Sequence, residues 1–302
     1  MRVFVTGGTG LIGRAVIDAL VQRRDEVVCV TRHATRARSL LPVGVEFVEA
    51  DPVESGPWQD VAANCDGIVN LAGEPLAGGR WTEGRKRRIR RSRLATTRHV
   101  AQAAEGSERV RVLVSGSAVG YYGDAGERAL DETAEPGHDF LGRLALEWEE
   151  NARSAQSRSR RVVLLRTGIV LSRVGGALPR LTLPFRLFLG GPLGSGRQYF
   201  PWVHLEDVAR IVLFALDTPG LTGPVNAVAP DPPRQRQFAA SLGRALGRPS
   251  WLPVPPLALR LTAGEMAWAL LAGQRAIPRA LRARGFIFAH PNLDQALADL
   301  LG

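Results

Sequence analysis

The residues with the clearest chemistry form a glycine-rich turn close to the N-terminus. The apolar residues 3–5 are followed by Thr-Gly-Gly-Thr-Gly-Leu-Ile-Gly at 6–13. A strand, a glycine turn and a helix start in this order make a site for a dinucleotide pyrophosphate, because the first helical N–H groups favour an anion. An ordinary turn is the alternative, since glycines also occur in many loops. The expected cofactor contacts here are Gly7, Thr9, Gly10, Leu11, Ile12 and Gly13.

The residues after the second expected strand, 26–30, bear on which dinucleotide binds. Folds that bind NAD carry an acidic residue here, which bonds the ribose 2′-hydroxyl. This chain has Thr31 and Arg32 instead, with Arg36 close behind. An arginine pairs with a 2′-phosphate, whereas a carboxylate would repel it. The sequence therefore predicts NADP as the cofactor; the alternative is that these arginines are only surface charge.

Further candidate contacts follow the later strands, because ligands of doubly wound sheets lie beyond the carboxyl ends of the strands. Asp51 either accepts a hydrogen bond from the adenine amino group or starts a turn with Pro52. Arg93, on the next long helix, faces either the cofactor or solvent. The other candidates are Leu71, Ala72, Gly73, Glu74, Ser115 and Gly116.

The elements that must position these residues alternate between strand and helix patterns. Strands are expected at 45–48, within 66–73, and at 109–115 and 161–166, and helices at 11–23, 82–105 and 139–153. This alternation predicts an α/β fold with a Rossmann-type, doubly wound parallel sheet and helices on both faces. We expect a cofactor domain over 1–166, to which part of 203–230 returns. Residues 167–302 then form a smaller, partly interleaved substrate lobe, with helices at 206–216, 235–246 and 257–271.

Composition limits the class of protein. The chain has 302 residues, of which 45% are hydrophobic, and no apolar run approaches the roughly 20 residues that span a bilayer. Two cysteines are too few for a disulfide framework or a metal cluster. We expect a cytoplasmic protein without a membrane partner.

The formal charge of +10 raises the question of a nucleic-acid partner. Lys86 is the single lysine, and this excess of arginine suggests a compositional bias across the whole chain. The densest run, 85–93, is expected to be a solvated helix face, with phosphate binding as the alternative. A nucleic-acid partner is disfavoured because no motif for reading bases accompanies the charge.

Several segments together resemble a known family. They are 3–13, Val-Asn-Leu-Ala-Gly-Glu-Pro at 69–75, Arg-Trp-Thr at 80–82, Ser-Ala-Val-Gly-Tyr-Tyr-Gly at 117–123, Gly-Ser-Gly-Arg-Gln at 194–198, Trp-Val-His at 202–204 and Asn-Ala-Val-Ala-Pro at 226–230. The chain resembles the extended, sugar-nucleotide-epimerase-like branch of the short-chain dehydrogenase/reductase superfamily, and within it the atypical NAD(P)-dependent epimerase family proteins. The resemblance implies an NADP-binding sheet, a C-terminal substrate lobe and a small carbonyl or sugar-nucleotide-like substrate.

The usual catalyst of that superfamily is missing. A Tyr-x-x-x-Lys pair cannot be built, because no tyrosine has a lysine four residues on. Ser117 matches the superfamily serine and would bond a substrate oxygen, or it caps a turn. Tyr122 is a proton donor or a packing residue. These two are the catalytic candidates, and the proton-transfer group would be an altered one.

The resemblance also implies a substrate loop containing Arg197 and Gln198, with Arg197 as anchor for an anionic group. His204 and Asp207 are expected to be structural, because no second His or Cys lies at ligand spacing, so no metal is expected. The predicted function is an NADP-dependent oxidoreductase or epimerase-like enzyme. The alternative is a non-catalytic NADP-sensing or scaffold protein, and a homodimer through the long helices is compatible with either.

Overall fold

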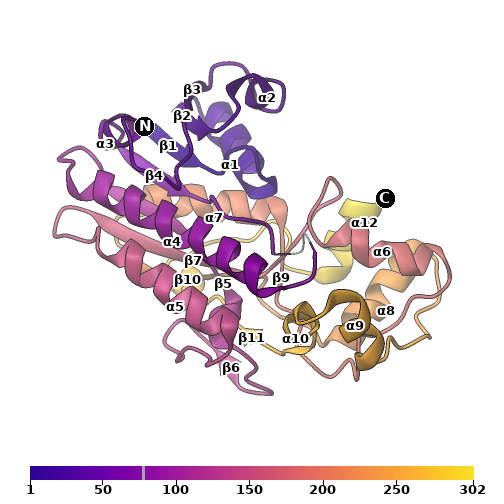
Figure 1. The fold of residues 1–302 in the computed structure, drawn as a ribbon. Coiled ribbons are helices and arrows are strands. Elements are labelled where there is room, and N and C mark those ends of the chain that lie inside the picture. Colours follow the sequence, from indigo (N-terminus) through magenta and orange to yellow (C-terminus); the bar gives the residue numbers. More distant parts are fainter. Residues whose placement is uncertain (77–78) are drawn as a thin grey trace.

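The computed structural model describes residues 1–76 and 79–302 (Figure 1). Its largest element is a parallel sheet in the order β10-β7-β5-β4-β1-β2-β3, and this confirms the expected doubly wound class. The strand order reverses beside β1, where such sheets bind ligands. The strands are β1 (Arg2–Thr6), β2 (Glu26–Thr31), β3 (Glu46–Glu49), β4 (Gly67–Asn70), β5 (Val112–Ala118), β7 (Arg161–Thr167) and β10 (Gly223–Ala227).

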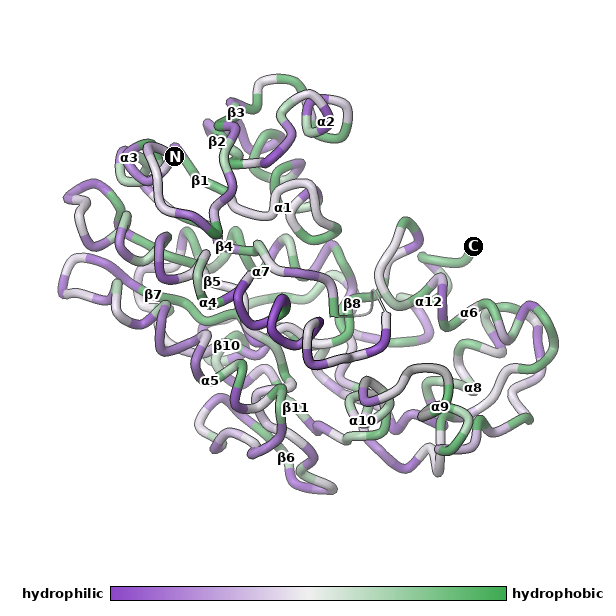
Figure 2. The backbone as a smooth tube through the Cα atoms, in the orientation of Figure 1, coloured by the Kyte–Doolittle hydropathy of each residue, from purple (hydrophilic) through white to green (hydrophobic). Residues whose placement is uncertain are grey.

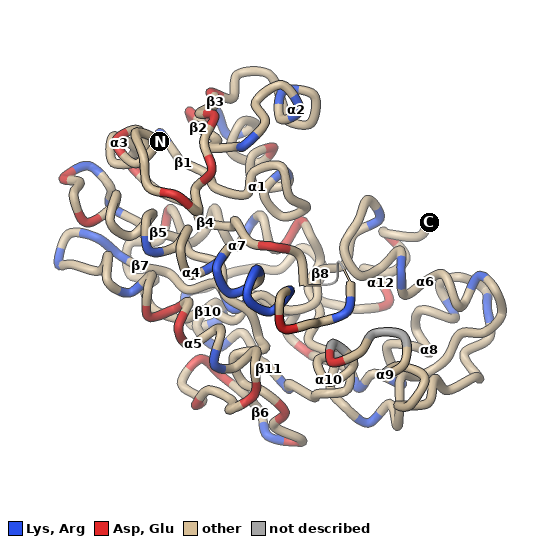
Figure 3. Tube along the Cα trace, in the orientation of Figure 1, with Lys and Arg blue, Asp and Glu red and all other residues tan. Residues whose placement is uncertain are grey.

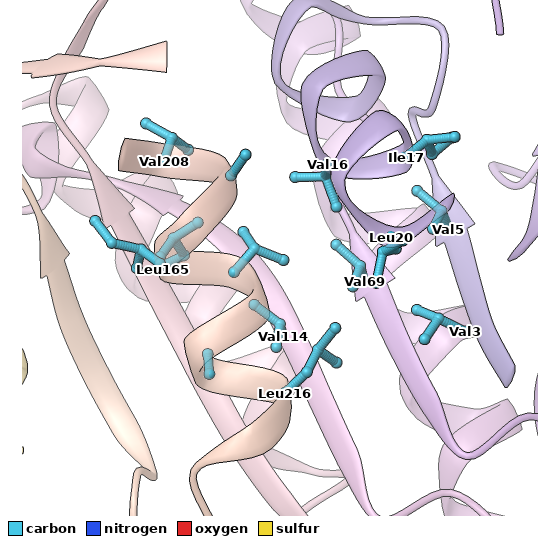
Figure 4. Close-up of a cluster of buried hydrophobic side chains, with 14 of the residues drawn as sticks. Val3, Val5, Val16, Ile17, Leu20, Val69, Val114, Leu165, Val208 and Leu216 are labelled. Carbon is cyan, nitrogen blue, oxygen red and sulfur yellow. The ribbon is translucent and has the colours of Figure 1, made fainter. Parts of the chain in front are cut away.

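Helices cover both faces of the sheet because its strands are apolar on both sides. On one face, α1 (Leu11–Gln22) packs on the odd-numbered residues of β1, and α7 (Leu205–Asp217) lies beside α1 and contacts β5. Figure 4 shows Val16, Ile17 and Leu20 of α1 beside Val3 and Val5. The other face is covered by α3 (Trp58–Ala63), α4 (Glu83–Glu105) and α5 (Phe140–Arg153). Two short elements, α2 (Ala34–Arg38) and the 3-10 turn η1 (Val119–Tyr122), follow the ends of β2 and β5.

Helix caps set several of the boundaries that the sequence predicted. The Thr82 side chain accepts from the N–H of Arg85 and begins α4. Asp139 accepts from the N–H of Gly142 and begins α5. The fifth strand starts later than expected, at Val112, because the Ser107 hydroxyl accepts the N–H groups of Arg109 and Val110 and holds them in a turn.

The C-terminal lobe has its own apolar core between α6 (Leu178–Arg186), α8 (Gln235–Leu246) and α12 (Leu293–Leu301). The expected single helix over 257–271 is wrong: Gly264, at φ +61°, separates α9 (Pro256–Ala263) from α10 (Met266–Leu271). Two small sheets, β8 (Ile169–Leu171) with β9 (Trp202–His204) and β6 (Ala129–Leu130) with β11 (Arg275–Ala276), join this lobe to the large sheet, and α11 (Arg279–Ala283) packs near β10.

Hydropathy follows this layering. The strands of the large sheet are largely green in Figure 2, while the outer face of α4 is purple. Among the described helices, none is both long and apolar enough to cross a bilayer.

Candidate functional site

The glycine turn between β1 and α1 is shaped so that only glycine fits. A Cβ atom added at Gly13 would lie 2.2 Å from the carbonyl oxygen of Gly7. Gly7 itself has φ +70°, and its Cβ would lie 2.6 Å from the carbonyl carbon of Leu71. The N–H of Gly10 donates to that same Gly7 oxygen at 3.0 Å. The turn therefore packs backbone against backbone and leaves room for a ligand close above it.

The start of α1 is free to hold an anion. Gly10 is the N-cap and offers no side-chain acceptor, and the first helical turn contains no acidic residue. The N–H groups of Leu11, Ile12 and Gly13 thus keep their capacity to donate, while Thr9 beside them is exposed. The geometry fits a pyrophosphate, and the cofactor contacts expected of these residues stay a prediction.

A buried chain of hydrogen bonds fixes the ends of β1, β4 and β5 relative to one another. The Thr6 hydroxyl donates to Asn70 Oδ1 at 2.7 Å and accepts from the N–H of Ala72 at 3.1 Å. Asn70 Nδ2 donates to Thr97 and, at 3.3 Å, to the hydroxyl of Ser115. The sequence reading missed Asn70, because an asparagine at a strand end gives no signal until its distant partners are known.

Ser115 belongs to the same hydrogen-bond network. Its side chain is fully buried and accepts from Asn70, so the hydroxyl helps to hold the strand ends together. Gly116 is packed tightly, since a Cβ there would lie 3.1 Å from the ring of Trp148. Leu71 and Ala72 border the glycine turn directly, through the N–H bond of Leu71 to the Thr6 carbonyl oxygen.

The end of β2 presents both signs of charge. Arg32 and Arg36 are exposed, while Thr31 is half-buried. Glu49 of β3 pairs in register with Thr31 and accepts from the N–H of Ala34 at 3.2 Å. Glu49 is thus engaged with the backbone at the start of α2, while Arg32 and Arg36 stay exposed where the sequence predicted a 2′-phosphate.

Asp51 behaves as a turn residue. Its Oδ1 accepts from the N–H of Val53 at 3.1 Å, and its carbonyl oxygen accepts from the N–H of Glu54. This geometry favours the turn alternative for Asp51 over the bond to adenine.

The arginine-rich run on α4 is not a uniformly solvated face, which corrects the expectation for 85–93. Arg85 and Arg93 are buried and hold the segment after β4. Arg85 donates to the carbonyl oxygen of Pro75 at 2.6 Å, and Arg93 donates to that of Glu74 at 2.9 Å. The N–H of Glu74 in turn donates to Ser92 at 2.9 Å.

Arg93 faces neither open solvent nor a carboxylate at hydrogen-bond distance. Its guanidinium lies over the ring of Trp148, 5.2 Å from the centroid, and against Gly73. Burial lowers the pKa of Arg93 to about 10, with Glu74 opposing the shift. Arg93 therefore positions the backbone at Gly73 and Glu74, directly after the end of β4.

A buried ion pair lies below the ends of β5 and β7. Arg166 Nε and Nη2 donate to the two oxygens of Glu149 at 2.7 and 2.9 Å, and both side chains are almost completely buried. Although burial disfavours its charge, the bonds to Glu149 raise the pKa of Arg166 above its usual range. The guanidinium also lies 3.4 Å from the ring centroid of Tyr121. Neither member of this pair was predicted to belong to the site.

Ser117 and Tyr122, the two catalytic candidates, are both bound into this network. The Ser117 hydroxyl donates to Glu149 at 2.8 Å. The Tyr122 hydroxyl donates to Asn226 Oδ1 at 2.7 Å and accepts a hydrogen bond from Arg166 Nη1 at 3.0 Å. Burial raises the pKa of Tyr122 to about 12, against the opposing effect of Arg166. This arrangement favours the structural alternative for both hydroxyls.

Two adjoining cavities open at the ends of β5 and β7. The first, of about 440 Å³, is mostly apolar and is lined by the residues that follow both strands, 118–120 and 167–169. Its far wall includes Trp81, Phe140 and Trp268. The second, of about 590 Å³, shares Asp139, Trp268 and Ala272 with the first.

The second cavity is lined with charge. Its ionisable residues are Asp124, Arg128, Glu135, His138 and Asp139, together with the buried Tyr122. Arg197 and Gln198 line neither cavity. Gln198 donates to the carbonyl oxygen of Leu193 at 3.0 Å, and Arg197 is exposed. The structure thus does not bring the predicted substrate anchor to these cavities.

His204 and Asp207 lie at the start of α7, as expected for structural residues. Asp207 accepts the N–H groups of Ala289 and His290, and His204 Nδ1 accepts the N–H of Glu206. The reason given against a metal was wrong, however, because the fold stacks His290 on His204 with ring centroids 3.7 Å apart, near Asp299.

The geometry nevertheless opposes a metal at this His cluster. A neutral imidazole whose Nδ1 accepts a hydrogen bond carries its proton on Nε2. The Nε2 of His204, which faces Asp299 at 3.4 Å, then has no lone pair for a metal ion. Among the described residues, this is the one group of three or more His, Cys, Asp and Glu side chains close enough to share an ion.

Comparison with known proteins agrees with this fold and glycine turn. Residues 3–227 match the NAD dependent epimerase/dehydratase family. This chain belongs to that family. Residues 254–300 also match a domain of unknown function, DUF1731.

Relatives in this family cover the chain from end to end. The epimerase family protein SDR39U1 of mouse is 40% identical over 308 residues, with 100% of each chain covered. A homologue from Arabidopsis thaliana, named as chloroplastic, is 37% identical and covers 100% of this chain and 87% of its own length. The crystal structure of human SDR39U1 (isoform 2) with NADPH has a TM-score of 0.88 at 37% identity, covering 100% of this chain and 99% of that chain.

Proposed function

We propose that this protein binds NADP(H) and exchanges a hydride with a small carbonyl or alcohol substrate. The cavity of about 440 Å³ at the ends of β5 and β7 carries this proposal. If the adenosine end lies at β2 and the pyrophosphate at the glycine turn, the nicotinamide extends toward β5. The cavity is then next to the reactive ring, and its lining is mostly apolar.

The cofactor assignment is supported from two directions. The glycine turn has the backbone spacing that a pyrophosphate requires, and Arg32 is exposed at the end of β2. The human relative was crystallised with NADPH. We place the reaction in the cytosol as part of the proposal, although the Arabidopsis relative is named as chloroplastic.

Asp139 is the residue that we assign to proton exchange with the substrate oxygen. When bound, the cofactor supplies or accepts the hydride, so the protein must give or take a proton. The ionisable residues lining the first cavity are Asp139 and Glu265. Glu265 is paired with Lys86, whereas Asp139 uses its Oδ1 to cap α5 and lines both cavities. This assignment replaces Ser117 and Tyr122, whose hydroxyls are bound in the ion-pair network.

The charge of the second cavity narrows the substrate class. Asp124, Glu135 and Asp139 supply three carboxylates, against the arginine Arg128 and a histidine. A nucleotide diphosphate would bring further negative charge into this cavity, and like charges close together repel. We therefore favour a small, uncharged or amine-bearing carbonyl compound over a sugar nucleotide.

The experiment combines a binding measurement with a turnover measurement. NADPH affinity is measured by fluorescence titration, and NADPH consumption is followed with a panel of small aldehydes and ketones. Asp139→Asn keeps a side-chain cap on α5 but removes the carboxylate. We expect its kcat to fall by about 10²–10⁴-fold with NADPH affinity unchanged.

Two control variants make this result specific. Asp60→Asn, at an exposed position on α3, should leave both readouts unchanged. Tyr122→Phe should lower stability but retain most of the turnover, because its hydroxyl bonds Asn226 and Arg166. An inactive Tyr122→Phe that is fully folded would return the catalytic role to the phenol.

The alternative function is a non-catalytic NADP-binding module. Its support is that Ser117 and Tyr122, the hydroxyls matching the superfamily catalysts, are both held in a buried network. Tight NADPH binding without turnover of any panel member would favour this alternative. In that case the cofactor should change the affinity for a protein partner.

A further inference from the structure

An exposed apolar run follows α6. Leu187, Phe188 and Leu189 are consecutive and each is more than half exposed. Phe188 has φ +63°, a left-handed conformation that bulky side chains rarely adopt. Three large apolar side chains in succession on a loop raise the risk of aggregation, and the backbone strain adds a further cost. A feature that is doubly unfavourable for the isolated chain indicates a function.

The run is part of a surface held in place by hydrogen bonds and close packing. Trp251 Nε1 donates to the Phe188 carbonyl oxygen at 3.2 Å, and the Trp251 N–H donates to that of Gly190 at 3.0 Å. A Cβ at Gly190 would lie 2.3 Å from the ring of Phe185, so the loop is closely packed underneath. We call this surface the apolar ridge; its members, all more than half exposed, are Leu183, Leu187, Phe188, Leu189 and Trp251.

The two segments that build the apolar ridge carry charge of one sign in the sequence. These segments, 172–205 and 232–264, contain nine of the 39 basic residues and none of the 29 acidic ones. The rest of the chain thus has 30 basic and 29 acidic residues, which is nearly neutral. The net positive charge is therefore concentrated in these two segments, although arginine replaces lysine along the whole chain.

Arginines of these two segments lie next to the apolar ridge. Figure 3 shows blue segments and no red along the chain at and just after α6. Arg248 lies 4.6 Å from the ring centroid of Phe188, and Arg186 ends α6 beside Leu187. Two of the nine basic residues are paired with carboxylates from other segments, Arg244 with Asp294 at 3.0 Å and Arg234 with Glu127 at 2.6 Å. Among the described residues, neither Arg186 nor Arg248 has a carboxylate partner in an ion pair.

We propose that the apolar ridge docks this protein on the surface of membranes that contain anionic phospholipids. Tryptophan, phenylalanine and leucine favour the boundary between headgroups and acyl chains, and arginines beside them pair with lipid phosphates. An apolar centre of this kind opposes a nucleic acid, whose surface along the backbone is charged. The attachment is peripheral, in keeping with the described helices being too short or too polar to span a bilayer.

The proposal is independent of the hydride-transfer function. In Figure 1, α6 lies on the right of the molecule, away from β3 and α2 at the top. None of the five ridge residues belongs to the glycine turn, and NADPH affinity can therefore serve as a measure of correct folding in every variant.

The test is co-sedimentation of the full chain with vesicles of phosphatidylcholine, with and without phosphatidylserine. We expect binding to the anionic vesicles, weakened by salt. The double variant Leu187→Ser with Trp251→Ser should bind at least about tenfold more weakly, because two apolar side chains no longer insert. Val43→Ser with Ile287→Ser, at two still more exposed apolar positions, should bind like the wild type.

A charge variant tests the arginines separately. Arg186→Gln with Arg248→Gln should lose the preference for anionic vesicles, whereas Arg87→Gln with Arg88→Gln, on the exposed face of α4, should keep it. The proposal is overturned if no vesicle binds the wild type, or if the ridge variants bind as well as the wild type. It is also overturned if these variants only dissociate a soluble dimer, since the apolar ridge would then be an interface between copies.

Discussion

Two regions lie at the carboxyl ends of the strands, and they differ in how their residues are brought together. At β1 and α1, the glycine turn is built by residues within 13 positions of the N-terminus, whose shape follows from local backbone geometry. At β5 and β7, Ser117, Glu149 and Arg166 come from separate elements and meet in a buried network. A site formed by neighbours in sequence can be recognised from its residue types. A site formed by distant residues cannot, because each side chain has several possible partners.

The largest expected effect is a loss of stability in the region at β5 and β7, whose residues are far apart in the sequence. Arg166→Met should leave the Glu149 carboxylate buried without its main partner, at a cost of about 3–5 kcal/mol in the free energy of unfolding. Arg153→Met is the matched control, because it removes the half-exposed partner of that carboxylate at 2.9 Å. The control should cost about 1 kcal/mol or less. Urea denaturation measures the free energy of unfolding of both variants. Equal losses would show that the buried pair stabilises the fold no more than the half-exposed one.

The next effect is on NADPH affinity and tests the glycine turn between β1 and α1. Gly13→Ala places a Cβ 2.2 Å from the Gly7 oxygen, so the turn must open and the phosphate cradle is lost. We expect NADPH affinity to fall by about 100-fold, or roughly 2.7 kcal/mol. Gly56→Ala, where the added Cβ makes only an ordinary contact, should leave affinity unchanged. Wild-type affinity in Gly13→Ala would argue that the ligand lies elsewhere.

A smaller effect concerns the choice between NADP and NAD at β2. Arg32→Ala should weaken NADPH binding by about tenfold while NADH binding stays the same, because one phosphate contact is lost. Arg38→Ala serves as the control, since Arg38 lies over the ring of Phe47. Parallel titrations with both cofactors decide the matter. If the two affinities fall together, Arg32 does not read the 2′-phosphate.

The smallest effect is a pH dependence at the stacked histidines. Burial, and then the neighbouring His290, lower the pKa of His204 below its usual 6.5. The unfolded chain therefore binds this proton more readily than the folded chain, and stability is lost as pH falls below about 6.5. Asp299, Asp207 and Glu206 also face the ring and oppose the shift.

His204→Asn keeps a side-chain acceptor for the cap of α7 and removes the titrating group. The unfolding free energy that is lost below about pH 6.5 should then be smaller, by about 1 kcal/mol or less, and its plot against pH should be flatter there. His33→Asn, at an exposed position after β2, should not change the slope. A slope that is the same in all three proteins would assign the acid sensitivity to other groups.

The sequence by itself determined the features that depend on short-range geometry. Thr82 and Asp139 cap α4 and α5 where the pattern placed them, and the glycine turn connects a strand to a helix as predicted. These features follow from hydrogen bonds and backbone conformations within a few residues, so residue types and spacing are sufficient.

Only the tertiary structure decided which side chains are available to react. It placed Ser117 and Tyr122 in hydrogen bonds with Glu149, Arg166 and Asn226, and it put Asp139 on the wall of both cavities. It also stacked His290 on a residue 86 positions away in the chain. The physical reason is that burial and pairing depend on long-range packing, and one side chain has a different chemistry when it is paired, buried or open to a cavity.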